Sequence, residues 1–167
     1  MFYEFIVKLI GAGIASSLYF LPFQINYSNN FFYIEASLNV PITTDIEQLI
    51  KKGYCFQIQY SFTIIVNDKR SYSANEINKV LYNQKWQVND SSVLYDSLQK
   101  KAGHSIIQFN RFKFDEGDKL FIFVNAHVLP DEGFTQSTGF QPSILWSYCV
   151  PRKQETYILR NGTFVKQ

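Results

Sequence analysis

The sequence contains few residues of the kinds that catalyse reactions or bind metals. Among 167 residues there are two cysteines, two histidines and one methionine, and only 18% of the residues are charged. One cysteine pair excludes the disulfide framework of a small secreted scaffold. There is no paired-cysteine zinc pattern, phosphate-binding loop, nucleophile elbow or His-Glu-x-x-His motif. We therefore expect a protein that is not an enzyme and that has no cofactor and no metal site.

Strong charge of either sign is also missing. The net charge is +2, and lysine and arginine occur singly or in scattered pairs. Nucleic-acid-binding proteins usually collect such charges into one basic patch, so we expect no nucleic-acid partner. Aromatic residues, in contrast, are abundant, with 16 Phe and 11 Tyr. Aromatic side chains suit the pleated surface of a sheet, and the length fits one domain, so the composition predicts a single β-rich domain.

An apolar segment opens the chain. Residues Leu9–Phe23 carry no charge, and counting from Phe5 gives 19 residues with Lys8 as the one charge. A cleaved signal peptide would end in a small-x-small site, but the small residues 15–17 lie inside the apolar run. This favours an uncleaved signal-anchor in residues 5–23 over a removed signal peptide, and both over a buried helix of a cytosolic protein.

This reading predicts residues 1–23 as the leader and residues 24–167 as an extracytoplasmic β-rich domain. The protein would cross the inner membrane once with its main domain in the periplasm, or would be exported if the leader is cleaved.

Period-two alternation dominates the rest of the sequence. We expect strands at 24–28, 31–40, 54–66, 79–88, 105–114, 119–129 and 144–150, and a tail hairpin over 155–166 around Asn161-Gly162. Two short helices are expected, one from a capping box at residues 44–47 through Lys52, and one over 93–102 with Leu94 and Leu98 on one face. Without βαβ alternation, this order predicts a mostly β, antiparallel β-sandwich-like domain with two short helices, preceded by an N-terminal hydrophobic helix.

Five segments of the sequence carry a resemblance to a known family. They are TTDIEQLIKKG, CFQIQYSFTIIV, VLYNQKWQV, SSVLYDSLQKK and LFIFVNAHVLP, in this order after an apolar leader. Over residues 30–150 the chain resembles an uncharacterised family of bacterial envelope proteins, a domain of unknown function with an N-terminal export signal. It differs in lacking Arg-rich strand edges and in adding the tail hairpin beyond Pro151. The resemblance implies export and a non-enzymatic envelope role, and it provides no catalytic residues.

The main functional hypothesis is a membrane-tethered module for protein interaction or assembly, which binds through a sheet edge or the loop over 130–143. Its expected interaction residues are Phe134, Phe140 and Trp146, because exposed aromatic residues on loops often bind partners. The alternative is a carrier of an apolar ligand or lipid in a cavity of the sheet. A hydrolase using Cys149 and His127 is a third and weaker hypothesis.

The two cysteines leave a further choice open. An oxidising compartment would permit a disulfide between Cys55 and Cys149, whereas two unpaired thiols are the simpler interpretation, which we favour. The acidic residues around Gly117 resemble a fragment of a calcium loop, but an acidic hairpin turn is the commoner meaning of such a pattern. His127 with Asp131 and Glu132 gives an equally weak metal pattern.

Overall fold

Strands make up most of the fold. The computed structural model describes residues 18–28, 31–53, 55–110, 113–130 and 150–167. Within these residues the elements are β1 (Tyr19–Phe20), β2 (Gln24–Ser28), β3 (Phe31–Asn39), α2 (Thr44–Lys51), β4 (Phe56–Val66), β5 (Arg70–Asn83), β6 (Lys85–Val88), β7 (Ser91–Val93), α3 (Tyr95–Ala102), β8 (His104–Asn110), β9 (Lys119–Pro130), β10 (Arg152–Arg160) and β11 (Thr163–Lys166).

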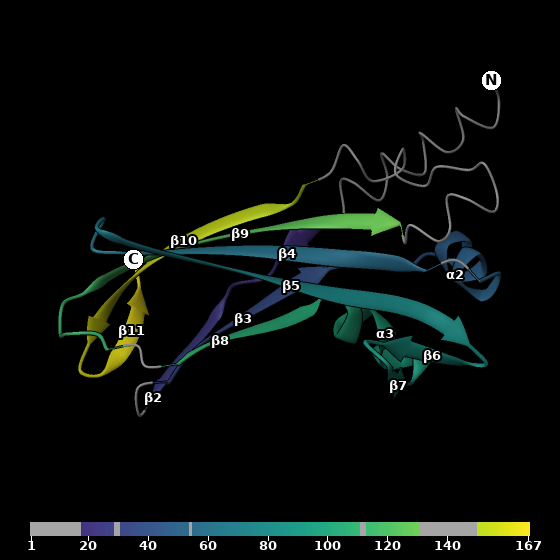
Figure 1. Ribbon diagram of the computed structural model, residues 1–167, viewed down its shortest axis with the longest axis horizontal. Helices are drawn as coiled ribbons and strands as arrows, with labels where there is room; N and C mark the ends of the chain where they lie inside the picture. Colours follow the sequence, from purple (N-terminus) through teal and green to yellow (C-terminus); the bar gives the residue numbers. More distant parts are fainter. Residues whose placement is uncertain (1–17, 29–30, 54, 111–112, 131–149) are drawn as a thin grey trace, which may run out of the picture.

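The strands form two antiparallel sheets. In the larger sheet the order is β11-β10-β9-β4-β5-β6-β7. In the smaller sheet β2 and β8 pair with the same residues of β3 and therefore lie on its two edges, and β1 pairs with the end of β3. Figure 1 shows the smaller sheet along one face of the larger one, with α2, α3, β6 and β7 gathered at the end opposite the β10–β11 hairpin. The predicted mostly β, antiparallel, sandwich-like fold with two short helices is confirmed for the described residues.

The core follows the predicted alternation. Each of the strands β3, β4 and β9 turns every second side chain inward, as expected for sheets that pack on one face only. The fully or almost fully buried residues of these strands are Phe32, Ile34, Ala36, Leu38, Ile58, Tyr60, Phe62, Ile64, Val66, Leu120, Ile122, Val124, Ala126 and Val128. Burial of each large apolar side chain contributes about 1.5–3 kcal/mol, so this interior is the main source of stability.

Polar side chains inside the sandwich are tied to the opposite sheet. Asn78 of β5 is buried, and its amide donates to the carbonyl oxygens of Ala102 at 2.9 Å and His104 at 2.7 Å. The Oδ1 of Asn78 accepts a hydrogen bond from Asn89 at 2.9 Å. The Ser105 hydroxyl is 2.6 Å from Oε2 of Glu76. These contacts link β5 of the larger sheet to the α3–β8 connection.

An aromatic cluster closes the other end of the molecule. The Phe32 ring lies 5.2 Å from Phe114 and 5.7 Å from Phe164, and Phe114 and Phe164 are 5.0 Å apart. Tyr27 joins the cluster through Phe114, and its hydroxyl accepts the Phe114 N–H. The tail hairpin therefore packs onto the smaller sheet. Asn161 and Gly162 both have positive φ, as the predicted Asn-Gly turn requires.

Both helix starts differ from the predictions. The hydroxyl of Thr43, rather than that of Thr44, accepts a free N–H of the first turn of α2, that of Ile46, so the predicted capping box at 44–47 is wrong by one residue. Helix α3 begins at Tyr95, because residues 91–93 pair with β6 as strand β7. Leu94 is the N-cap of α3 and is exposed, so the predicted apolar pair with Leu98 is also wrong.

The strand predicted over 79–88 is a hairpin. Gln84 has a φ of 58° and separates β5 from β6, and Tyr82 pairs with Trp86 across the turn. Residues 71–78, which had no clear pattern, belong to the long strand β5. Residues 5–17 of the predicted N-terminal helix and most of the predicted strand at 144–150 lie outside the described residues, whereas the end of that predicted helix, residues 18–23, contains strand β1. Pro151 directly precedes β10.

Candidate functional site

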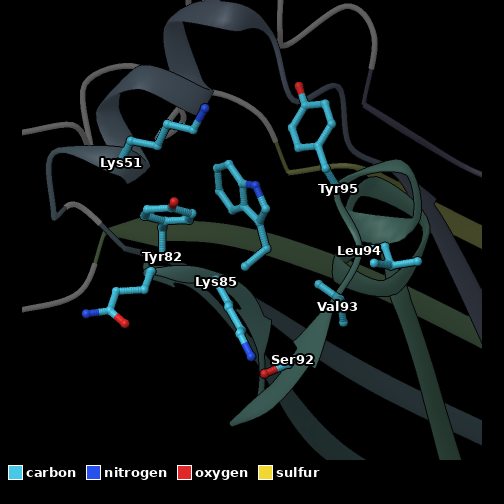
Figure 2. Close-up of a pocket in the computed structure, with 9 residues that line it drawn as sticks. Lys51, Tyr82, Lys85, Ser92, Val93, Leu94 and Tyr95 are labelled. Carbon is cyan, nitrogen blue, oxygen red and sulfur yellow. The ribbon is translucent and has the colours of Figure 1, made fainter.

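A cleft of about 570 Å³ opens where α2, α3 and strands β5 to β7 meet (Figure 2). Aromatic side chains, two lysines and a few small or polar residues line it: Lys51, Tyr82, Gln84, Lys85, Trp86, Ser92, Val93, Leu94 and Tyr95. The charged residues of this lining are its two lysines; Lys51 forms an ion pair with Glu47 at the rim, so Lys85 is the main source of positive charge in the cleft. Apolar and aromatic walls with a few polar groups are typical of binding sites.

Trp86 is the centre of the aromatic contacts in the cleft. Its ring centroid lies 5.0 Å from that of Tyr82 in an edge-to-face arrangement and 5.7 Å from that of Tyr95. The β5–β6 hairpin places Trp86 opposite Tyr82, and β7 places Val93 on its other side. Only 7% of Trp86 is exposed, so the surrounding strands hold the indole in position. The ring therefore forms a fixed wall of the cleft, and little of its surface is open to a ligand.

Leu94 and Tyr95 form the exposed part of the cleft. Leu94 is 78% exposed and Tyr95 47% exposed, although both are large and partly or wholly apolar. The cause is local: Leu94 has extended backbone angles at the start of α3 and turns away from the buried face that Leu98 occupies. No side chain caps the helix at this point. An exposed leucine beside a fixed aromatic cluster costs free energy in water, so this position is a candidate contact surface.

A polar network fixes the rim of the cleft. Lys51 lies 2.5 Å from Oε1 of Glu47, and the Tyr95 hydroxyl donates to Oε2 of the same carboxylate at 2.7 Å. The Lys51 ammonium is also 5.9 Å from the centroid of the Trp86 ring, within the range of a cation–π contact. The hydrogen bonds from Lys51 and then Tyr95 lower the pKa of Glu47. The same bonds raise the pKa of Lys51 and of Tyr95, so all three groups keep these protonation states at neutral pH.

Strand β7 provides a sheet edge beside the cleft. Among the described residues β7 pairs only with β6 and is the last strand of the larger sheet. Ser92 and Val93 of this strand also line the cleft. An edge strand offers backbone N–H and C=O groups to an incoming extended chain. The edge and the aromatic cleft are therefore adjacent.

The predicted interaction residues are not among those described. Phe134, Phe140 and Trp146 fall within 131–149, as does Cys149. The aromatic loop contact, the disulfide and the Cys149–His127 pair therefore stay predictions. Cys55 is half-buried just before β4.

The acidic residues around Gly117 hold the turn. Asp118 accepts the backbone N–H of Asp115 at 2.9 Å and the amide of Asn67 at 2.7 Å. Glu116 accepts the N–H of Asn161 at 2.8 Å. Among the described residues no group of three or more potential ligands is arranged for a metal ion. The interpretation as an acidic turn, rather than part of a calcium loop, fits these contacts.

Sequence reasoning missed the cleft itself. Trp86 and Tyr82 were assigned to one strand, where residues four apart lie too far from each other for ring contact. Leu94 was assigned to the core face of a helix. The available signal was the run Val93-Leu94-Tyr95, three apolar residues in succession between polar ones, which neither a one-sided strand nor an amphipathic helix can bury completely.

A search for relatives of this chain gives no match among family models, curated proteins or solved structures. The resemblance to the envelope family therefore stays a prediction. The described part of the chain contains no helix with the length and apolar character needed to span a membrane. The fold and the cleft define the chain as a β-sandwich-like domain with an aromatic cleft at one end.

Proposed function

We propose that the protein is a non-enzymatic interaction module, and that it binds an extended polypeptide segment of a partner protein in the cleft. The observation that carries this proposal is the exposure of Leu94 and Tyr95 beside the fixed ring of Trp86. Binding energy at protein interfaces concentrates on a few such apolar and aromatic anchors that rest on a rigid surround. The cleft provides this arrangement on one short stretch of chain.

The chemistry of the partner segment follows from the neighbouring groups. The outer edge of β7, which pairs only with β6 among the described residues, supports an occupant that adds as a strand, since main-chain hydrogen bonds then supply affinity while side chains enter the adjacent pocket. Lys85 favours an acidic side chain in the occupant, whereas Lys51 is already paired with Glu47. We expect an apolar anchor against Leu94 with an acidic residue close to it.

The proposal includes a location outside the cytoplasm. Its support is the apolar leader with Lys8 near its start, and the resemblance to exported envelope proteins. The sequence predicted a module tethered to the inner membrane, with release after cleavage as the other possibility.

The carrier of an apolar ligand receives less support from the cleft. A lipid carrier needs an enclosed apolar cavity, whereas this cleft is open and carries two lysines on its lining. The large side chains Phe32, Tyr60 and Phe62 fill the described interior between the sheets.

Panning of a random linear peptide library against the full-length protein tests the proposal. Enriched peptides are expected to share an apolar residue next to an acidic one. Leu94→Ser is expected to weaken their binding at least tenfold in titration calorimetry, because the apolar anchor contact is lost.

Ile106→Ser is the matched control, since Ile106 is also a branched apolar residue, 45% exposed, but lies on β8 in the other sheet. It should leave the affinity unchanged. Peptides whose binding is equally sensitive to both substitutions, or a library with no enriched sequence, would overturn the assignment of the cleft.

A further inference from the structure

The end of the predicted leader belongs to the folded domain. Leu18, Phe20 and Phe23 are only 8%, 7% and 6% exposed. Strand β1 pairs with β3 through Tyr19 and Phe20, and the Phe20 ring lies 6.3 Å from that of Tyr60 in the opposite sheet. These residues therefore fill part of the interior between the two sheets.

Polar contacts to β10 fix the same segment. The backbone N–H of Phe23 donates to Oε2 of Glu155 at 3.3 Å. The Lys153 ammonium donates to the carbonyl oxygen of Phe20 at 3.3 Å and lies 5.8 Å from the centroid of the Phe23 ring. The backbone groups and the ring that take part in these contacts cannot face lipid at the same time, so the segment 18–23 is not available to a membrane span.

Without 18–23, the apolar stretch is too short for an anchor. It runs from Phe5 to Ser17, is bounded by Glu4 and includes Lys8, whereas a helix needs about 20 apolar residues to cross the hydrocarbon core. Up to Ile14 this stretch is 10 residues long, which lies within the about 7–15 residues of the apolar region of a cleavable signal.

A small-x-small sequence stands at the boundary between this stretch and the fold. Ala15, Ser16 and Ser17 directly precede Leu18, the first buried residue. The sequence alone places these small residues inside the apolar run, because Tyr19 to Phe23 continue that run beyond them. The structure assigns that continuation to the core, which places the small residues after the apolar region, where a signal peptidase cuts.

We propose that the leader is a cleaved signal and that the peptide bond between Ser17 and Leu18 is the cleavage site. A signal peptidase hydrolyses this bond: the C–N bond breaks, water adds its hydroxyl group to the Ser17 carbonyl carbon, and its remaining hydrogen goes to the Leu18 nitrogen. The carboxylic acid formed then gives its proton to the new amino terminus at Leu18, which leaves a carboxylate and an ammonium group. A cut after Phe23 would remove three buried side chains from the core, those of Leu18, Phe20 and Phe23. A cut after Ser17 removes no buried side chain among the described residues. The mature domain, residues 18–167, is then released from the membrane. This inference rests on the export proposed above.

Expression of the full-length chain in a bacterium with an intact export pathway tests this site. The intact mass and the amino-terminal sequence of the protein from the envelope fraction should begin at Leu18. Ser17→Tyr should reduce processing at least tenfold, because a signal peptidase accepts only small residues at the position before the cut. Ser16→Tyr is the matched control: it should be processed normally, since the middle position of the small-x-small sequence is unrestricted.

The outcomes separate processing from export. Full-length protein in the membrane fraction, with its domain accessible to protease from outside, would overturn the cleavage site and leave export intact. Full-length protein in the cytosol would overturn both. A mature terminus at any residue other than Leu18, or processing that Ser17→Tyr leaves unchanged, would contradict the assigned bond.

Discussion

Two buried tyrosines show how one hydroxyl group stabilises or destabilises according to its partner. Tyr60 is fully buried, and its hydroxyl has no hydrogen-bond partner among the described residues. Tyr157 is 5% exposed, and its hydroxyl donates to the Glu155 carboxylate. Burial raises the pKa of both phenols, and near Tyr157 the bond to Glu155 raises it further, so both stay protonated at neutral pH. The two side chains differ mainly in hydrogen bonding.

Tyr60→Phe is therefore expected to raise the free energy of unfolding by about 1 kcal/mol, because it removes a buried polar atom that has no partner. Tyr157→Phe should lower it by about 1–2 kcal/mol, since the Glu155 carboxylate loses a donor. Urea unfolding of the two variants beside the wild type measures both changes. Equal effects of the two substitutions would show that the loss of packing, rather than hydrogen bonding, determines the result.

Glu155 connects stability to pH. The carboxylate is 5% exposed and lies 2.6 Å from Lys166 and 3.3 Å from Lys153. Burial alone would raise its pKa, but hydrogen bonds from Lys166, Tyr157 and Lys153 outweigh burial and lower the pKa from its ordinary value of 4.5. A carboxyl group with a lowered folded-state pKa stabilises the fold above its unfolded-state pKa, and this contribution disappears as the pH falls through the folded-state pKa.

Glu155→Gln should consequently reduce the free energy of unfolding by about 2 kcal/mol at pH 7, with a smaller difference from wild type below about pH 4. Urea unfolding over the range from pH 3 to pH 7 follows the change. Glu35→Gln on β3 makes the same chemical substitution at a half-exposed position and should change the free energy of unfolding at pH 7 by less than about 0.5 kcal/mol. A difference for Glu155→Gln that stays constant over this range would contradict the role of ionisation.

At the level of elements, the α3–β8 connection depends on close contact of two backbones. Gly103 ends α3, and its carbonyl oxygen accepts the Leu38 N–H at 2.7 Å. A Cβ atom at Gly103 would lie 2.0 Å from the Leu38 carbonyl oxygen, far inside van der Waals contact. The φ of −85° at Gly103 suits any residue, so the space, and not the backbone angle, requires glycine here.

Gly103→Ala should therefore lower the free energy of unfolding by about 2–3 kcal/mol, because β3 and α3 must move apart. Gly53→Ala is the informative comparison. Gly53 has a φ of 96° but open space around it, so its substitution costs about 1 kcal/mol through backbone strain alone. Thermal or urea unfolding ranks the two variants, and a smaller loss for Gly103→Ala than for Gly53→Ala would contradict the contact argument.

Most elements could be predicted from the sequence because alternation is a strong signal where one face is buried. The strands β3, β4 and β9 and the Asn161-Gly162 turn follow directly from it. The hairpin at Gln84 could not be predicted, since glutamine rarely adopts positive φ and the alternation continues across the turn. The start of α3 was wrong because Ser91 and Ser92 look like helix caps but pair with β6.

These two errors concealed the candidate site. Trp86 contacts Tyr82 only because the chain reverses at Gln84, and Leu94 is exposed only because α3 starts two residues later than predicted. Both features depend on the pairing of β5, β6 and β7, which brings together residues that a linear pattern keeps apart. The cleft is therefore a product of tertiary pairing and has no motif of its own.

For the whole molecule, the short segment 18–23 connects the two sheets. The rings of Phe20 and Phe23 are 6.2 Å apart, and Phe20 reaches Tyr60 of the larger sheet from a strand that pairs with the smaller one. The segment is too short to stabilise a sheet by its own hydrogen bonds. Its contribution is the apolar surface that it places between the sheets.

Phe20→Ala should thus lower the free energy of unfolding of the full-length protein by about 3–4 kcal/mol, as expected when a large buried side chain is replaced by alanine in a core. Tyr19→Ala is the adjacent control: Tyr19 is also aromatic and in β1, but it is 54% exposed, so the loss should stay below about 1 kcal/mol. Urea unfolding monitored by tryptophan fluorescence compares the two. Similar small losses for both variants would show that 18–23 is dispensable for the fold, and a mature terminus beyond Leu18 would then be as stable as the one proposed.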